Sequence, residues 1–236
     1  MKESDREALA VWHLKNCPLF AALEPRELGE VFHQSRIVGL GPNEIVPETD
    51  AAEPSLWVVK RGHVRLAYVD QEGHSATVLI LGPGDLFGTV LNGKATNYGE
   101  HCSTITSACL CRISASRFEA FLQKYPLVSY NLMKASFSRI HRLQARLADF
   151  MVRPAEARLA LVLLDLDREI GEDAPEGGRL LGLPLSHQDL AQLIGSSREM
   201  VTHLLGKFRR GGVVATTRER IVLTDRTSLE VARDVW

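Results

Sequence analysis

Residues 183–214 read LPLSHQDLAQLIGSSREMVTHLLGKFRRGGVV. Apolar residues recur at helical spacing on both sides of Gly195, a residue that suits a tight turn. Ser186 followed by Asp189 predicts an N-cap with an acidic residue in the first helical turn. Ser196, with Glu199 three residues on, matches the capping box of a second helix. The stretch therefore predicts a helix-turn-helix.

The second helix of this pair is expected to present a polar face to solvent. If its apolar residues turn inward, the opposite face consists of Ser197, Arg198, Glu199, Thr202, His203 and Lys207. Arginine can bond both guanine acceptors, glutamate can accept from the cytosine amine, and lysine can neutralise a phosphate. This face is therefore suited to the major groove of DNA.

A β-hairpin wing is expected directly after the second helix. Val213-Val214 and Ile221–Leu223 are the two apolar runs, and Arg218 and Arg220 lie between them. Residues 196–220 contain six cations and two anions, a local charge of +4. The two arginines of the wing are accordingly predicted to join the DNA-binding face.

Composition narrows the class of protein. The chain has 236 residues and a formal net charge of 28 − 29 = −1, which excludes nucleic-acid binding through overall basicity. No stretch approaches the ~18 apolar residues of a membrane helix, and the charged N-terminus lacks the apolar core of a secretory signal. Four cysteines are too few for a disulfide scaffold in a chain of this length. A cytoplasmic protein with reduced thiols is expected.

Upstream of residue 154 the texture of the sequence changes twice. Residues 5–36 have helical spacing, whereas residues 37–115 contain short apolar runs punctuated by glycine and proline, which predicts a small barrel or roll. The expected strands are Leu56–Val59, Val64–Val69, Thr77–Leu81, Ser103–Ser107 and Leu110–Ile113. After Pro154, residues 155–170 are again helical, and Gly171–Gly178 is expected to be a loop.

A long helix is expected over residues 127–153, which contain neither glycine nor proline. Apolar and small residues recur there at alternating spacings of four and three, the seam pattern of a coiled coil. The alternative is a helix packed on its own domain. We favour a dimer interface, whose candidate residues are Met133, Ile140, Leu143, Leu147 and Phe150.

With these motifs in place, the sequence resembles the CRP/FNR family of bacterial transcription regulators from about Leu14 to Leu229. The resemblance is carried by CPLFAAL (17–23), VVKRGHVRLAYVDQEG (58–73), GPGDLFG (82–88) and DLAQLIGSSREMVTHLL (189–205). It implies an α+β fold with a cyclic-nucleotide-binding-like jelly roll (1–125), a dimerisation helix (126–153) and a winged helix-turn-helix (154–236). It also implies a homodimer and contact with RNA polymerase. We expect no membrane association, no enzymatic activity and no cofactor.

By the same resemblance, Arg198 and Glu199 would read a palindromic site similar to TGTGA. The family commonly has arginine where this chain has His203, so the preference at that base pair is expected to differ. A histidine is shorter and mostly neutral at pH 7.

The effector pocket departs further from cyclic-AMP-binding members. Those members hold the nucleotide with a glutamate, an arginine pair and residues of the long helix. The corresponding positions here are Gly88 with Thr89, then Tyr98, and Leu143 with Gln144. No arginine lies between Arg65 and Arg112, although a cyclic phosphate needs a cation or several convergent N–H donors. Cyclic AMP is therefore not expected, and another small-molecule effector remains open.

Three other kinds of site are alternatives to an effector pocket in the roll: an iron–sulfur cluster, a haem and a cupin-like metal site. Cys17 and Cys111 fall where two of the four cluster cysteines of the FNR branch lie, and His101-Cys102 could be a haem ligand pair. A cluster generally needs four thiolates, so we expect buried structural cysteines and no metal site. A cupin-like metal enzyme would need clustered histidines, whereas His63, His74 and His101 are isolated in sequence.

Overall fold

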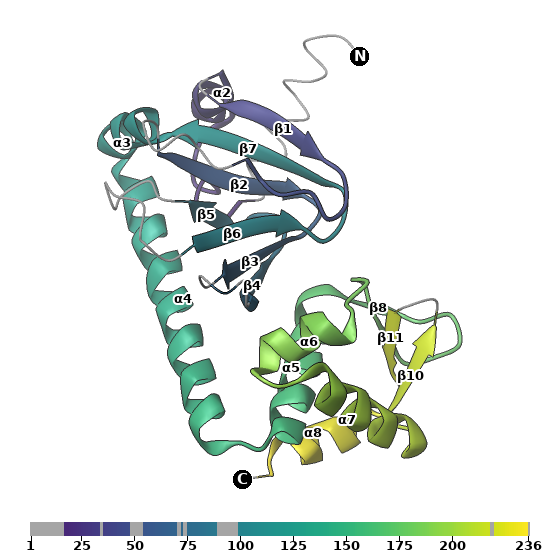
Figure 1. Cartoon of the computed structure of the whole chain (residues 1–236). Coiled ribbons are helices and arrows are strands. Elements are labelled where there is room, and N and C mark those ends of the chain that lie inside the picture. The colour runs from purple at the N-terminus through teal and green to yellow at the C-terminus, as the bar shows by residue number, and fades with distance from the viewer. Residues whose placement is uncertain are drawn as a thin grey trace. The chain divides into compact units, whose positions relative to one another are not determined.

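The computed structural model describes residues 17–33, 35–47, 54–69, 72, 75–88, 99–217 and 220–235. The chain divides into two compact units, coloured from purple to yellow along the sequence in Figure 1. One unit comprises residues 1–70 and 79–141, and the other comprises residues 71–78 and 142–236. The division falls inside the long helix, and the three-part boundaries given above stay a prediction.

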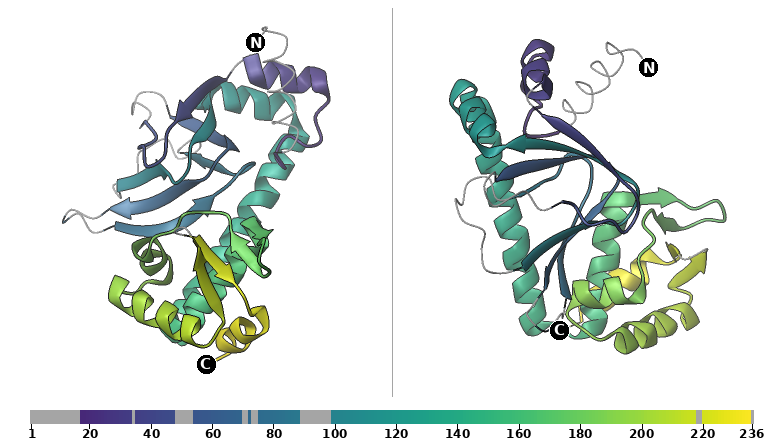
Figure 2. Two further views of the ribbon diagram at one scale, coloured as in Figure 1. Left: turned by 90° about the vertical axis from the view of Figure 1, so that its right-hand side faces the viewer. Right: turned by 45° about the horizontal axis from the view of Figure 1, so that its top comes forward.

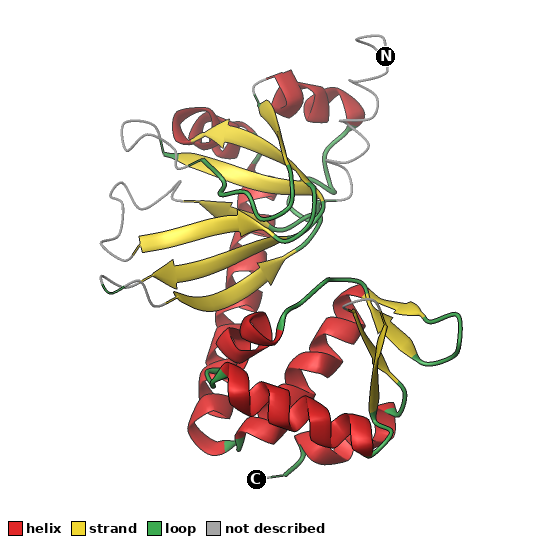
Figure 3. Ribbon diagram, turned by 45° about the vertical axis from the view of Figure 1, so that its right-hand side comes forward, coloured by secondary structure: helices red, strands yellow, loops and turns green. Residues whose placement is uncertain are grey.

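The N-terminal part of the chain contains a β roll of two sheets, formed by strands of the first unit together with β4, whose first four residues belong to the second (Figure 3). One sheet has the order β1-β7-β2-β5, formed by β1 (Arg36–Leu40), β7 (Ala108–Ser114), β2 (Ser55–Arg61) and β5 (Leu86–Gly88). The other has the order β4-β3-β6, formed by β4 (Ser75–Leu81), β3 (Val64–Val69) and β6 (Gly99–Thr104). Four of the five expected strands are thus confirmed.

The expected strand Ser103–Ser107 is wrong at its C-terminal end. β6 ends at Thr104, and the Thr104 hydroxyl donates to the carbonyl of Gly41 while accepting from the N–H of Glu44 at 2.9 Å. The N–H of Ile105 then turns to the carbonyl of His63 at 2.8 Å. These bonds to other loops satisfy the backbone where the ladder stops.

The expected helix over residues 5–36 is also wrong in its described part. Residues 17–24 form turns, α2 covers Pro25–His33, and Arg36 already belongs to β1. Pro18 and Pro25 cannot continue a helix from the preceding turn, so the chain bends at each. The apolar side chains of this segment are nevertheless buried, with Phe20 packed edge-on against Phe121 at 6.0 Å between ring centroids.

Two helices complete the first unit and lead into the second. They are α3 (Ala115–Lys124) and α4 (Pro126–Val152), and two further views show α4 as one continuous helix (Figure 2). Val128 is the buried residue near its start, while most of its length is exposed in the single chain. Pro154 then caps α5 (Ala155–Ile170), because its fixed φ suits a helix start but not a helix interior.

The second unit is an α+β domain around α5, which packs against α6, α7 and α8. Its elements are β8 (Gly171–Asp173), β9 (Arg179–Leu181), α6 (His187–Ile194), α7 (Arg198–Arg210), β10 (Val214–Thr217), β11 (Arg220–Leu223) and α8 (Arg226–Arg233). The four strands form one sheet in the order β10-β11-β9-β8. The expected loop 171–178 is therefore partly wrong, because its first residues pair with β9 in a hairpin.

Candidate nucleic-acid interface

The first helix of the pair, α6, begins with a reciprocal cap. The Ser186 hydroxyl accepts from the N–H of Asp189 at 3.1 Å, and the Asp189 carboxylate accepts from the N–H of Ser186 at 2.8 Å. The backbone N–H groups of Ser186 and Asp189, which have no partner within the helix, are thereby satisfied. The predicted N-cap at Ser186 is confirmed, and it has the full capping-box geometry.

The tight turn between the helices forms at Gly195, as expected. Its φ of 57° is left-handed, and its N–H bonds back to the carbonyl of Gln192. The capping box expected at Ser196 is wrong by one residue. Ser197 is the N-cap of α7, and its hydroxyl accepts from the N–H of Met200 at 3.1 Å. α7 therefore begins at Arg198.

The faces of α7 separate as the sequence predicts. Val201, Leu204, Leu205 and Phe208 are buried against the rest of the domain. The exposed side carries Arg198, Glu199, Thr202, His203, Lys207, Arg209 and Arg210. At about 100° per residue, Glu199, His203 and Arg210 lie near the middle of this exposed side, with Arg198 and Thr202 along one margin.

Glu199 is held in its ionised form at the start of α7. Hydrogen bonds from its own backbone N–H and from the Ser197 side chain lower the pKa of its carboxyl group. An ionised carboxylate only accepts hydrogen bonds, so it can receive one from a base amine but not from a base carbonyl or ring nitrogen. This is the property that the cytosine-reading role requires.

Lys207 lies at the other margin of the exposed side and has a partner within the protein. Its Nζ donates to both carboxylate oxygens of Glu156 at 2.8 and 2.6 Å, and Glu156 belongs to the first turn of α5. This contact was not indicated by the sequence, because the two residues are 51 positions apart. The assignment of Lys207 to a DNA phosphate stays a prediction, now in competition with an internal ion pair.

The wing is confirmed as a two-stranded hairpin. β10 and β11 pair antiparallel with Thr217 opposite Arg220. Arg220 is exposed at the tip of this hairpin, whereas Arg218 lies outside the described residues.

The turn at Gly195 is supported from behind by two side chains. The ring of Phe150, near the end of α4, packs closely against Gly195. A Cβ atom at position 195 would lie only 2.9 Å from Cε1 of this ring. The guanidinium of Arg158 stands 5.4 Å from the centre of that ring and donates to the carbonyls of Ile194 and Gly195 at 2.9 and 3.4 Å. Phe150, proposed above for the dimer seam, thus packs against its own helix-turn-helix, although 39% of it remains exposed.

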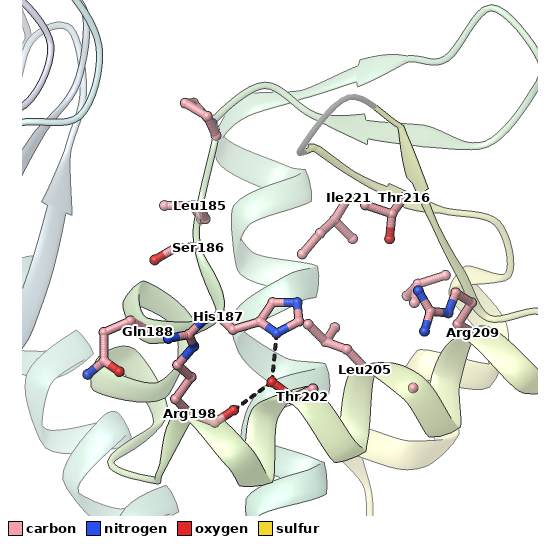
Figure 4. A pocket seen from close by; sticks show the side chains of 13 residues that line it. Leu185, Ser186, His187, Gln188, Arg198, Thr202, Leu205, Arg209, Thr216 and Ile221 are labelled. Atoms are coloured by element: carbon pink, nitrogen blue, oxygen red, sulfur yellow. Dashed lines mark hydrogen bonds between the residues drawn. The ribbon is translucent and has the colours of Figure 1, made fainter.

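A groove of about 610 Å³ is lined by the first turn of α6, by one margin of α7 and by the wing (Figure 4). His187, Arg198 and Arg209 bring polar and cationic groups to it, and Leu205 and Ile221 form an apolar floor. His187 and Arg209 were not among the predicted site residues. His187 is the first residue of α6, and Arg209 lies at the margin of α7. These positions are the only indications in the sequence that the two residues belong to the site.

In the roll, only part of the expected effector site can be placed. Thr89 and Tyr98 lie outside the described residues, while Leu143 and Gln144 are exposed on α4. Gly88 has a φ of 116°, and a Cβ there would lie 2.2 Å from the carbonyl oxygen of Ser55. Gly88 is therefore required by the close approach of β5 to β2, independently of any ligand.

The cysteines behave as core residues. Cys17 and Cys111 are buried in one apolar cluster, and burial raises the pKa of the Cys17 thiol to about 11 and that of Cys111 above its usual value. The Cys17 thiol donates to the carbonyl of Gly84 at 3.3 Å. Among the described residues, no three histidine, cysteine or acidic side chains are grouped so as to hold a metal ion. Both thiols are therefore packed as core residues, and the expected absence of a metal site stays a prediction.

Comparisons with known proteins agree in both halves of the chain. Residues 38–125 match the cyclic nucleotide-binding domain, and residues 157–232 match the Crp-like helix-turn-helix domain. A global nitrogen regulator from Synechocystis sp. is 31% identical over 182 residues, which are 76% of this chain and 80% of that protein. The chain belongs to the CRP/FNR family of transcription regulators.

Further relatives of this CRP/FNR regulator cover most of its length. A cyclic AMP receptor protein from Thermus thermophilus is 29% identical over 85% of this chain and 89% of that protein. The crystal structure of a CRP-family transcriptional regulator from the same organism superposes with a TM-score of 0.67 at 25% identity, over 84% of this chain and 97% of that one.

The comparisons confirm the expected fold of this CRP/FNR regulator, and its helix-turn-helix implies DNA binding. The relatives include a global nitrogen regulator and a CRP-family transcriptional regulator. Among the helices that the structure describes, none is both long and apolar enough to cross a membrane.

Proposed function

We propose that this CRP/FNR protein is a homodimeric, sequence-specific regulator that acts in the cytoplasm on a palindromic, TGTGA-like site and is not controlled by cyclic AMP. The observation that carries the proposal is the exposed side of α7, where Arg198, Glu199 and His203 follow one another on a helix that is capped and braced from behind. Such a helix can enter a major groove without rearranging. RNA polymerase is the further partner expected of a regulator of this family.

A dimer is supported by an apolar row along α4. The row is exposed in the single chain and consists of Tyr130, Met133, Phe137, Ile140, Leu147 and Met151, with Gln144 in the same register. Its spacings alternate between three and four residues, which makes a continuous seam. Large contiguous apolar surface of this kind marks an interaction site. Met133, Ile140 and Leu147 belong both to this row and to the expected seam. Leu143 and Phe150 of the expected seam are replaced by the residues that follow them, Gln144 and Met151. Tyr130 and Phe137 are added.

Control by a ligand other than cyclic AMP, or by none, is supported by the shortage of cations in the roll. The sequence has no arginine from 66 to 111, and Lys94, the one lysine between them, lies outside the described residues. Burial of Cys17 and Cys111 among apolar side chains supports a structural role for both cysteines over the iron–sulfur alternative. An absorption spectrum of anaerobically purified protein tests the second point: visible bands would support a cluster or haem, and a featureless spectrum agrees with the proposal. The first point is tested by a DNA-shift assay with and without cyclic AMP, in which cyclic AMP should leave the affinity unchanged.

Removal of the Arg198 side chain is expected to relax base preference at one position of each half-site. Arg198→Ala should lower affinity for the specific site by about 1–3 kcal/mol, because a bidentate contact to guanine is lost. Binding to random DNA should change far less. The measurement is a shift assay on a site and on its single-base variants. An equal loss on specific and random DNA would show that Arg198 contacts only the backbone.

Lys207 and Arg210 are expected to differ in their effect on salt dependence, although both are exposed cations on α7. Arg210 lies in the last turn of α7, and we expect it to contact one phosphate. Arg210→Ala should therefore reduce the slope of log K against log salt by about 1. Lys207→Ala should leave the slope unchanged, because Glu156 already neutralises that lysine. Titrations between 50 and 200 mM salt measure both slopes. An equal reduction of the slope in both variants would mean that Lys207 leaves Glu156 and contacts a phosphate when the protein binds DNA.

A further inference from the structure

A hydrogen-bonded pair joins the two helices of the helix-turn-helix at the edge of the groove. Nδ1 of His187, the first residue of α6, lies 2.7 Å from the hydroxyl oxygen of Thr202 on α7. The same hydroxyl donates to the carbonyl oxygen of Arg198 one turn earlier, at 2.9 Å. Figure 4 shows both bonds converging on the Thr202 oxygen.

The use of the hydroxyl hydrogen follows from counting protons. A threonine hydroxyl carries one hydrogen, which the carbonyl of Arg198 can accept. Nδ1 of His187 either donates to this hydroxyl or, in the other tautomer, takes its hydrogen in place of the carbonyl; in both cases the single hydrogen is used within the protein. Thr202 is thus held in one rotamer by two partners on two helices, and it has no proton left to donate to a base.

This arrangement decides which part of Thr202 can meet DNA. Guanine, adenine and thymine edges present acceptors in the major groove, and a hydroxyl whose hydrogen is already used cannot donate to these acceptors. The methyl group of Thr202 has no such internal role. The one major-groove feature that an apolar methyl group matches is the C5-methyl group of thymine. Thr202 is also exposed beside Arg198 and Glu199, on the face that is proposed to read bases.

We propose that Thr202 is a specificity-determining residue that recognises a thymine methyl group in each half-site, and that His187 is the positioning residue that holds it in place. This inference rests on the proposed DNA-binding function, since it assigns one base pair of the same interface. The thymine contact proposed for Thr202 is separate from the guanine and cytosine contacts proposed for Arg198 and Glu199.

Replacing each thymine of the specific site by deoxyuridine removes only the C5-methyl group and tests the proposal directly. The full chain is titrated with DNA in which one symmetry-related pair of thymines at a time is replaced. At one pair, affinity is expected to fall about fourfold per half-site, the factor for burying one methyl group, and about 15-fold for both. At the other thymines the change should stay below twofold.

Four variants separate this role from a merely structural one. Thr202→Ser, which lacks the methyl group, should bind thymine and deoxyuridine DNA equally, while Thr202→Val should keep the discrimination. His187→Ala should reduce it to below twofold, and His187→Gln, whose amide can donate the same bond, should restore it. His141→Ala is the control, because this histidine is exposed on α4 outside both the apolar row and the helix-turn-helix, and it should leave the discrimination unchanged.

The outcomes are distinguishable from a failure of the proposed function. If no thymine is sensitive to deoxyuridine, or if Thr202→Ser keeps full discrimination, the inference is overturned although specific binding stands. If the wild-type chain binds every DNA alike, the proposed function itself is overturned. Thermal melting of each variant confirms that the fold is retained in either case.

Discussion

Replacing Leu147 by lysine is expected to convert the dimer into monomers and to lower affinity for a two-half-site DNA by more than 100-fold. Leu147 lies in the middle of the second half of the apolar row on α4 and is 61% exposed in the single chain. In a dimer it would face its symmetry mate, so the substitution would place two like charges in a dry seam. Each monomer would then bind one half-site without the gain from linkage, which is worth roughly 10²–10⁴ in affinity.

Sedimentation velocity and a shift assay measure the two effects, and Ala145→Lys is the matched control. Ala145 is also exposed on α4, but two residues earlier, which at about 100° per residue puts it on the opposite side of the helix from Leu147. The control should remain dimeric and bind DNA normally. Because Leu147 has little burial in the single chain, both variants should fold. A Leu147→Lys protein that remains dimeric and binds with full affinity would contradict the seam on α4.

The second large effect is expected on stability. Asp167, near the end of α5, is 1% exposed, and its carboxylate lies 2.8 Å from Nε of Arg179 and 3.5 Å from Nη1 of Arg226. It therefore joins three elements of the DNA-binding domain: α5, β9 and α8. Asp167→Asn leaves two cations facing a buried amide, which should lower the free energy of unfolding of this domain by about 2–3 kcal/mol. This loss of stability is smaller than that expected for a fully buried ion pair, because the side chains of Arg179 and Arg226 are partly exposed to solvent.

Urea unfolding measures this change, and Asp173→Asn is the control on the same arginine. Asp173 also bonds Arg179, at 2.7 Å, but its side chain is 93% exposed. An exposed ion pair of this kind contributes about 0–1 kcal/mol, so its removal should change stability by less than about 0.5 kcal/mol. If the two substitutions destabilise the domain equally, burial of Asp167 is not what makes its bridge important.

The elements that could be predicted from the sequence are those with local signals. The two helices around Gly195 were predictable because apolar spacing, a cap at Ser186 and a glycine turn all lie within one short stretch. The wing was predictable for the same reason, since two apolar runs flank a short polar turn. The exposed side of α7 followed from placing Val201 and Leu204 inside, which needs only the helical period.

Contacts between residues distant in the chain could not be predicted in this way. The sequence predicts a phosphate contact for Lys207, because nothing near it in the chain indicates the ion pair with Glu156. Phe150 fits the seam by spacing alone, yet its ring packs at Gly195 because α4 ends beside that turn. The capping box was placed at Ser196 because two serines stand in a row, and only the backbone shows that Ser197 is the N-cap. In each case tertiary packing decided between locally equivalent choices.

Selection of binding sites by the full chain from a random DNA library tests the central claim most directly. The account predicts an enriched inverted repeat whose half-sites are centred about one helical turn apart, each with a G·C pair read by Arg198 and Glu199. The same selection with Arg198→Ala should lose the preference at one symmetric pair of positions only. An enriched motif with a single half-site, or no enrichment over the input library, would contradict a dimeric protein that reads DNA through α7.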